Sequence, residues 1–239
     1  MPPAPFRLVP GLSALSRTHG LYPQLQPDLA AFRQALGGLL LSLELAVISI
    51  AIGIVIGLLL AVWYVSAGRA VRTVIAGYVE FIRNVPLILL VYLVFYGLPT
   101  VVDIAYSAQT SFIATLSLYS GAYLVEVFRS GLEAVPRGQL DAGKAIGLTP
   151  WQRLLHVRLP TMLRITLPAL SNTFISLFKD TSVASVISVP ELTYGAQWIN
   201  FNTFRIVEVY LVVTAMYLLT GYALLFALRL VERRFKAAR

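Results

Sequence analysis

The sequence predicts an all-α integral membrane protein with five transmembrane helices and a polar loop on the cytoplasmic side. Of its 239 residues, 58% are hydrophobic and 13% are charged, whereas a soluble domain carries about 25% charged residues. The apolar residues gather in runs of about 20 residues, the length that an α-helix needs to cross a bilayer. Lys and Arg collect between these runs, as they do in the cytoplasmic loops of membrane proteins.

The first two apolar runs each carry a feature of helix packing. The first run covers residues 36–65 and contains Gly53 and Gly57, a GxxxG spacing that lets two membrane helices approach closely. The second run covers residues 73–99 and contains Pro86. Proline removes a backbone donor and disfavours helical geometry at the preceding residue, so we expect a break in the helix there. A different interpretation of this break would give four or six spans.

Three more apolar runs complete the predicted bundle, at residues 111–128, 165–189 and 206–228. The segment 191–205 mixes polar and aromatic residues, and we expect it to be a loop. The chain thus divides into an extracytoplasmic N-terminal tail (1–35), a transmembrane domain (36–234) and a cytoplasmic C-terminal tail (235–239).

Positive charge predicts the orientation of the bundle. Three basic segments alternate with segments that are nearly free of Lys and Arg: residues 69–72, residues 137–160 and the C-terminal end from residue 228. With five spans, these three segments lie on the same side of the membrane. Because basic loops stay in the cytoplasm, we expect the C-terminus inside the cell and the N-terminus outside.

Composition argues against several functional classes. Cytoplasmic loops explain the net charge of +8, and no long basic face lies outside them, so we expect no nucleic-acid partner. The chain has no cysteine and only two histidines, His19 and His156, which argues against a metal site. The sequence shows no arrangement of a nucleophile with a general base that would indicate catalysis. We therefore expect a chain that is not an enzyme and binds no cofactor of its own.

Residues 137–160 form a polar, basic island between two apolar runs, and this segment is the basic island below. Residues 142–146 have helical composition, and Gly147 is suited to end a helix. Thr149 and Pro150 suit the N-cap and the first position of a second short helix. The apolar side chains of these two helices either enter a groove on a partner protein or rest on lipid headgroups, and the pattern alone does not choose.

The spacing within the basic island resembles the EAA loop of bacterial ABC importer permeases. The matching residues are Asp141-Ala142-Gly143, then after three residues Gly147, after nine residues Val157, and after one residue Leu159-Pro160. The family pattern has Glu-Ala-Ala at its start and Ile in place of Val. Three other segments resemble the branch that serves polar amino acids such as histidine, glutamate, glutamine and arginine: residues 78–87, 121–136 and 176–185. The resemblance covers residues 36–234.

The resemblance implies the type I ABC importer permease fold in a bacterial inner membrane. Such permeases pair with an identical or similar permease and bind a dimer of cytoplasmic ATP-binding subunits, which hold the ATP and Mg²⁺. An extracytoplasmic solute-binding protein delivers the polar amino acid, and lipid surrounds the spans. The EAA loop is the coupling helix that docks on the ATPase, which assigns this role to Asp141, Ala142 and Gly147. Arg137 and Lys144 would reach acidic residues of the ATPase.

The predicted fourth span carries polar residues at helical spacing: Asn172, Ser176, Lys179, Asp180 and Ser182. Charges at membrane depth are costly and face either protein or a water-filled path. Lys179 and Asp180 therefore either meet the charged ends of an amino acid in a translocation pathway or brace the bundle.

Other polar groups lie in the second and third predicted spans. Arg83 and Asn84, at the proline break, either line the pathway or form a hinge. Glu126 and Arg129 are three residues apart, and we expect them to pair.

Two other functions compete with the importer permease. The chain could be an ion-coupled secondary amino-acid carrier that uses Asp180 and Lys179, or a membrane scaffold without transport. Carriers often contain inverted repeats, and we see none here, so the permease is the leading hypothesis.

Overall fold

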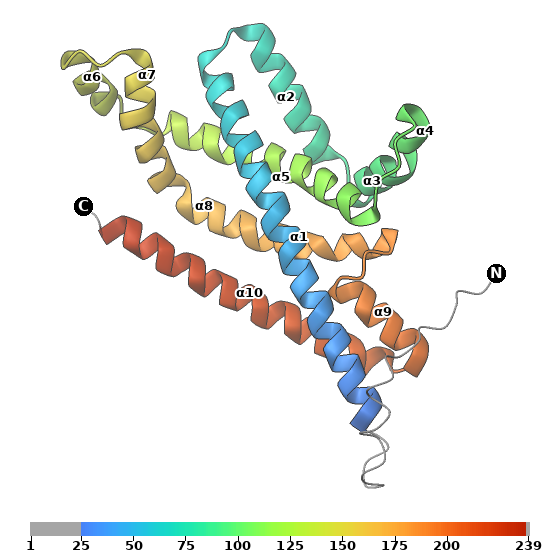
Figure 1. Ribbon diagram of the computed structural model, residues 1–239. Helices are drawn as coiled ribbons and strands as arrows, with labels where there is room; N and C mark the ends of the chain where they lie inside the picture. Colours follow the sequence, from blue (N-terminus) through green and yellow to red (C-terminus); the bar gives the residue numbers. More distant parts are fainter. Residues whose placement is uncertain (1–24, 238–239) are drawn as a thin grey trace.

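The computed structural model describes residues 25–237, and these form a bundle of α-helices (Figure 1). Residues 1–24 and 238–239 lie outside the described part, and they include most of the predicted N-terminal tail and the end of the predicted C-terminal tail. No strand occurs between residues 25 and 237. The predicted all-α class is confirmed.

The helices of the described part are α1 (Leu25–Ser66), α2 (Arg69–Asn84), α3 (Leu87–Tyr92), α4 (Leu98–Val102), α5 (Ala108–Glu133), α6 (Arg137–Ala145), α7 (Pro150–Arg153), α8 (Leu159–Asp180), α9 (Leu192–Thr203) and α10 (Ile206–Ala237). Two π-helical turns, Leu93–Gly97 and Leu154–Arg158, join α3 to α4 and α7 to α8. A 3₁₀ turn, Thr181–Ile187, follows α8.

Three helices in the described part are long and apolar enough to cross a membrane: Ala31–Ser66 of α1, α5, and Ile206–Arg234 of α10. A fourth is obtained if α2 and Leu87–Val102, which meet at 104°, are one broken span. This bend falls at Pro86, where the sequence predicted a break. α8 lies where the fourth span was predicted, but its composition is too polar for it to count among the helices that can cross a membrane. α1 also begins earlier than predicted, at Leu25 instead of residue 36.

A short helix, α9, replaces the loop that was predicted for residues 191–205. Glu191 is its N-cap and accepts a hydrogen bond from the N–H of Tyr194 (2.8 Å). Apolar side chains then recur at helical spacing on one side of α9. The buried ones are Leu192, Ala196 and Ile199. The prediction of a loop was wrong because polar residues on the outer side of α9 concealed this apolar stripe.

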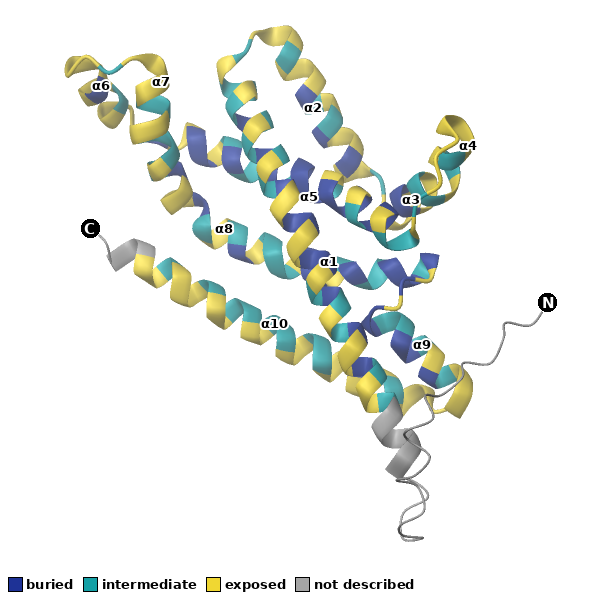
Figure 2. Ribbon diagram, in the orientation of Figure 1, coloured by how far each residue is buried: buried dark blue, intermediate teal, exposed yellow. Residues whose placement is uncertain are grey.

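The core is built around the contact between α1 and α5. A Cβ atom built on Gly57 of α1 would lie 2.6 Å from Leu124 Cβ of α5, so the GxxxG pair does mark a close approach of two helices. Figure 2 shows buried residues concentrated where α1 and α5 meet, whereas α10 is largely exposed. The largest fully buried side chains include Leu45, Ile50, Phe112, Leu116, Leu124 and Phe128.

The helices give the bundle two distinct ends. The turn between α1 and α2, the pair α6–α7 and the C-terminal end of α10 lie toward one side in Figure 1. The N-terminal end of α1, α4 and α9 lie toward the other side. The three basic segments therefore share one end of the molecule, as the predicted alternation of spans requires.

Candidate functional site: the basic island and the polar face of α8

The basic island folds into two short helices joined by a glycine turn, as predicted. α6 ends in a Schellman motif, in which the N–H of Leu148 donates to Gly143 O (3.0 Å) and the N–H of Gly147 donates to Lys144 O (3.0 Å). Gly147 has a φ of 84°, in the left-handed region where any side chain is strained. The turn from α6 to α7 therefore requires glycine at this position.

The start of α7 is fixed by its own sequence. The Thr149 hydroxyl accepts the N–H of Gln152 (3.3 Å), and the Gln152 side chain accepts the N–H of Thr149 (2.9 Å). Pro150 occupies the first turn, where the absent N–H would have no helical partner. The predicted N-cap is thus a complete capping box.

α7 continues into α8 without a break (Figure 1). The junction residues Arg153, Leu154, Arg158 and Leu159 all keep right-handed helical dihedral angles. The π-helical turn adds local widening, a feature that is frequent at functional sites. The second helix of the island and the polar helix of the predicted fourth span therefore form one continuous helical segment, which bends in Figure 1 and contains Pro168 inside α8. We call this bent helical segment the rod.

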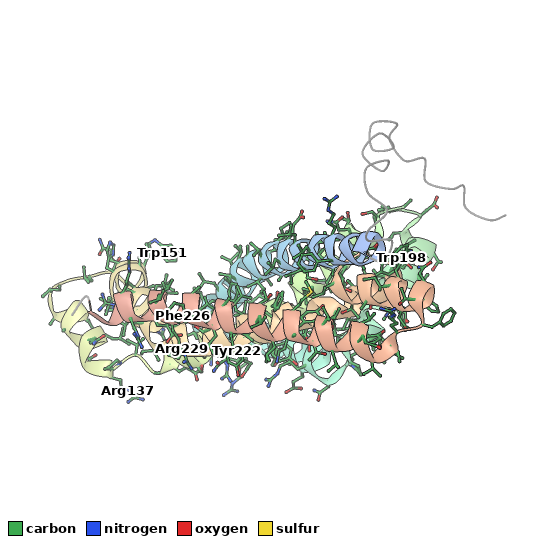
Figure 3. The ribbon with its side chains drawn as sticks, turned by 90° about the horizontal axis from the view of Figure 1, so that it is seen from below. Arg137, Trp151, Trp198, Tyr222, Phe226 and Arg229 are labelled. Carbon is green, nitrogen blue, oxygen red and sulfur yellow. The ribbon has the colours of Figure 1, made fainter. Side chains whose placement is uncertain are left out.

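All five island residues that were predicted to dock on a partner are exposed: Arg137, Asp141, Ala142, Lys144 and Gly147. Gly143 is buried instead, and a Cβ atom there would lie 3.4 Å from Arg153 Cγ and from Leu148 Cδ1. This glycine, which departs from the Ala of the EAA pattern, therefore lies in the contact between α6 and α7. Figure 3 shows Arg137 and Trp151 pointing to opposite faces of the island.

A cavity of about 860 Å³ lies between the C-terminal end of α1 and the basic island, and we call it the island cavity. Asp141 and Lys144 line it from α6, and Arg153 and Arg158 line it from the start of the rod. Apolar side chains of α1 form the facing wall. No sequence pattern predicts this cavity, because its walls come from segments that are distant in the chain.

α8 presents the predicted polar residues on one exposed face: Asn172, Ser176 and Lys179. Asp180 and Ser182 are half-buried, at the end of α8 and in the 3₁₀ turn. Lys179 also lines a cavity of about 330 Å³ against α10, together with Tyr217 and Tyr222. The described residues contain three ion pairs, and neither Lys179 nor Asp180 takes part in one. Within this part of the chain, these two charges do not brace the bundle by ion pairing.

Arg83 belongs to a ladder of charges between α2 and α5. Glu126 Oε2 lies 3.1 Å from Arg129 Nη2 and 4.0 Å from Arg83 Nη1, and Arg129 Nη1 lies 3.4 Å from Glu133 Oε1. The Arg83 guanidinium also lies 5.5 Å from the ring centroid of Tyr123. The predicted pair of Glu126 and Arg129 is confirmed, and Tyr123 is a neighbour that the sequence did not indicate. A pathway role for Arg83 stays a prediction.

Asn84 is the last residue of α2, next to the bend at Pro86. Its Nδ2 donates to Glu80 O (2.7 Å), and the N–H of Val85 donates to Phe81 O (3.2 Å). The side chain thus contacts its own helix, and its predicted place in the pathway stays a prediction.

A buried polar cluster that the sequence did not predict links α1, α9 and α10. Glu191 is fully buried, and its Oε2 accepts hydrogen bonds from the hydroxyls of Ser42 (3.1 Å) and Tyr217 (3.0 Å). Ser42 Oγ also accepts the N–H of Leu192 (3.2 Å). Acidic side chains are favoured at the N-terminus of a helix, so Glu191 ahead of an apolar stripe is the signal that could have indicated the start of α9, though not its contacts with Ser42 and Tyr217.

The family model for binding-protein-dependent transport system inner membrane components matches residues 53–237. The chain belongs to this family. The permease therefore has the fold that its EAA-like spacing implied, and the match includes the whole basic island and all of α8.

The permease is similar to curated relatives along most of its length. It is 36% identical over 200 residues to the glutamine transport system permease protein GlnP of Escherichia coli (strain K12), covering 83% of this chain and 91% of that protein. It is also 36% identical over 199 residues to the L-cystine transport system permease protein TcyB of Bacillus subtilis (strain 168), covering 83% of this chain and 85% of that protein.

Solved structures share the fold of the permease. An amino acid ABC transporter crystallised with histidines superposes with a TM-score of 0.79 at 31% identity, covering 87% of this chain and 96% of that chain. The inward-facing MetNI methionine ABC transporter superposes with a TM-score of 0.73 at 22% identity, covering 85% of this chain and 97% of that chain. The predicted ABC importer permease fold is confirmed.

Proposed function

We propose that this permease forms the translocation path of an ABC importer for a polar amino acid, together with an identical or similar permease subunit. A solute-binding protein delivers the amino acid on the extracytoplasmic side, and a dimer of cytoplasmic ATP-binding subunits supplies the work. The permease itself holds no ATP and catalyses no reaction. It lies in the bacterial inner membrane with its N-terminus outside and its C-terminus in the cytoplasm.

The observation that carries this proposal is the helical continuity of the rod from α7 into α8. One end of the rod belongs to the exposed basic island, and the other end carries Lys179 and Asp180, beyond the bend and Pro168. Helical elements with two alternative positions are a physical means of coupling distant sites. An ATPase dimer that binds nucleotide better in one conformation would move the island and, through the rod, the polar face of α8.

The names of the relatives and the charges of α8 support a polar amino acid as the substrate. The relatives are named for glutamine and cystine transport, and the similar crystal structure is that of an amino acid ABC transporter. Lys179 offers a positive charge to a carboxylate, and Asp180 offers a negative charge to an ammonium group. Because neither is ion-paired in the described part of the chain, both charges are available to a zwitterion.

A pair of glycine substitutions in the basic island tests the proposal. Gly147→Ala places a side chain at a φ of 84° and should distort the docking surface. Gly138→Ala is the matched control, because Gly138 lies in α6 with open space around its Cβ position. We expect Gly147→Ala to lose copurification with the ATP-binding subunits and ATP-driven uptake in proteoliposomes, and Gly138→Ala to keep both. Equal behaviour of the two variants would count against docking through this turn.

The energy source separates the proposal from its rivals. Uptake that survives ATP depletion but stops when the proton gradient collapses would favour a carrier that uses Asp180 and Lys179. Absence of any uptake by the complete complex would favour a scaffold.

Orientation has its own test, since the natural chain has no cysteine. A Gly138→Cys variant should react with a membrane-impermeant thiol reagent only after the cells are opened.

A further inference from the structure

We infer that the island cavity holds one anionic phospholipid of the cytoplasmic leaflet, with its phosphate among the basic side chains and its acyl chains along α1. This site goes beyond the proposed transport role. It rests on that proposal in one respect, the placement of the basic island at the cytoplasmic membrane surface.

The size and the apolar wall of the island cavity suit part of a lipid. Its volume of about 860 Å³ lies within the range of about 300–1,000 Å³ that is usual for small-molecule sites. Leu59, Val62 and Trp63 of α1 line it, and Leu140 and Leu154 face them from the island. The α1 residues belong to a helix that is apolar enough to span the membrane. A water-soluble partner would have to enter the bilayer to cover this wall, whereas an acyl chain already lies there.

The charges in the island cavity favour an anion. Lys144, Arg153 and Arg158 line it together with a single acid, Asp141. None of the three cations belongs to an ion pair of the described residues. Arg158 Nε donates to Leu132 O (3.1 Å), which fixes the guanidinium and leaves its terminal nitrogens to other acceptors. Phosphate oxygens are strong acceptors for such groups, and basic pockets at the cytoplasmic ends of membrane helices bind lipid headgroups.

Two tryptophans place the island cavity at headgroup depth. Trp63 and Trp151 line it, and their side chains are 57% and 64% exposed. Indole rings concentrate at the membrane–water interface because they combine an apolar ring with a polar N–H. The site thus spans the boundary between the apolar core and the charged surface, which is where a phospholipid changes from acyl chain to phosphate.

Fluorescence quenching by brominated lipid tests the site directly. The chain has three tryptophans, and Trp198 lies at the end opposite Trp151 (Figure 3). In a full-length Trp198→Phe protein, the remaining fluorescence therefore reports on the island cavity. The protein is reconstituted in mixed phosphatidylglycerol and phosphatidylcholine, with one or the other brominated. We expect phosphatidylglycerol to be preferred by about tenfold or more, since each basic residue contributes about fivefold.

Charge variants assign this preference to the island cavity. Lys144→Gln combined with Arg153→Gln should reduce the preference to about twofold or less, whereas Lys144→Arg combined with Arg153→Lys should keep it. Arg164→Gln is the matched control, because Arg164 is an exposed cation of α8 outside the cavity, and it should also keep the preference.

Four results would overturn the inference. The first three are no preference in the Trp198→Phe protein, the same loss in Arg164→Gln, and a loss in the charge-keeping double variant. The fourth is displacement of the lipid by added ATP-binding subunits, because Asp141 and Lys144, which line the cavity, would then serve only the docking surface. The two leaflets of the liposomes have the same composition, so the readout needs neither ATP nor a particular orientation. A negative result here therefore leaves the transport proposal intact, and failed uptake leaves the lipid site intact.

Discussion

Gly53 of α1 lies directly against Ser120 of α5. A Cβ atom built on Gly53 would stand 2.0 Å from Ser120 Oγ and 2.9 Å from Ser120 Cβ, closer than non-bonded atoms approach. The Ser120 hydroxyl is also within hydrogen-bond distance of Ser49 O in α1 (3.2 Å). Close approach through a small residue, with a hydroxyl bonded across the contact, is typical of helix pairs in membranes.

Replacing Gly53 by Ala should push α1 away from α5. Overpacking of a tight contact costs about 1–3 kcal/mol, and we expect a lower midpoint of thermal unfolding in detergent. Gly37→Ala is the matched control on the same helix, because nothing lies within 4 Å of its Cβ position. Gly37→Ala should be neutral or slightly stabilising through helix propensity. If both variants lower the midpoint equally, the close contact does not govern stability.

The buried cluster at Glu191 should be sensitive to loss of the carboxyl but tolerant of an amide. Glu191→Ala removes the N-cap of α9 and leaves the hydroxyls of Ser42 and Tyr217 without this partner. We expect a loss of about 2–4 kcal/mol from the lost cap and the unsatisfied hydroxyls. Glu191→Gln keeps an acceptor for the N–H of Tyr194 and should cost about 1 kcal/mol or less. Equal losses in the two variants would contradict a capping role.

The same carboxyl should give the permease a pH-dependent stability. Burial raises the pKa of the Glu191 carboxyl, and the hydrogen bonds that it accepts offset part of this rise. A carboxyl with a raised folded-state pKa binds more protons in the folded chain, so its contribution is full below the unfolded-state pKa and is lost as pH rises through the folded-state pKa. Unfolding midpoints measured between about pH 4 and pH 8 should therefore favour the wild type over Glu191→Gln most strongly at low pH. A difference that is constant with pH would refute this.

Local sequence signals predicted the parts of the fold whose causes are local. The N-cap at Thr149, the turn at Gly147 and the break before Pro86 each depend on residues within a few positions. The polar face of α8 followed from helical spacing alone. These features could be predicted because the backbone geometry that they require is encoded next to them.

The remaining features depend on contacts between distant segments. Ser42 and Glu191 are separated by 149 positions, so no local pattern joins them, and α9 was mistaken for a loop. The island cavity likewise has walls from α1 and from residues after 140. The polarity that gives α8 its exposed charges also lowers its hydropathy. Among the described residues, therefore, only three or four helices are long and apolar enough to cross a membrane, whereas the sequence predicts five spans.

The rod from α7 to α8 should transmit motion only while it stays helical. Leu155 and His156 are exposed in the π-helical turn, so they can be changed with little loss of packing. Replacing both by Gly should weaken the helix by about 1 kcal/mol per residue relative to replacing both by Ala. We expect the Gly pair to lower ATP-driven uptake several-fold while ATPase copurification persists. The Ala pair is the control, and equal uptake by the two pairs would show that continuity of this turn does not matter.

Lys179 should act on transport through its charge. The side chain is exposed on α8, lines the cavity against α10 and has no ion-pair partner among the described residues. If Lys179 binds the substrate carboxylate, loss of a charged hydrogen bond of about 1.5–3 kcal/mol should lower uptake by about 10–100-fold in Lys179→Gln. Lys179→Arg should retain part of the activity, and Arg164→Gln should have little effect. A brace between helices would behave differently: the unfolding midpoint would fall in Lys179→Gln, whereas a pathway residue changes uptake at an unchanged midpoint.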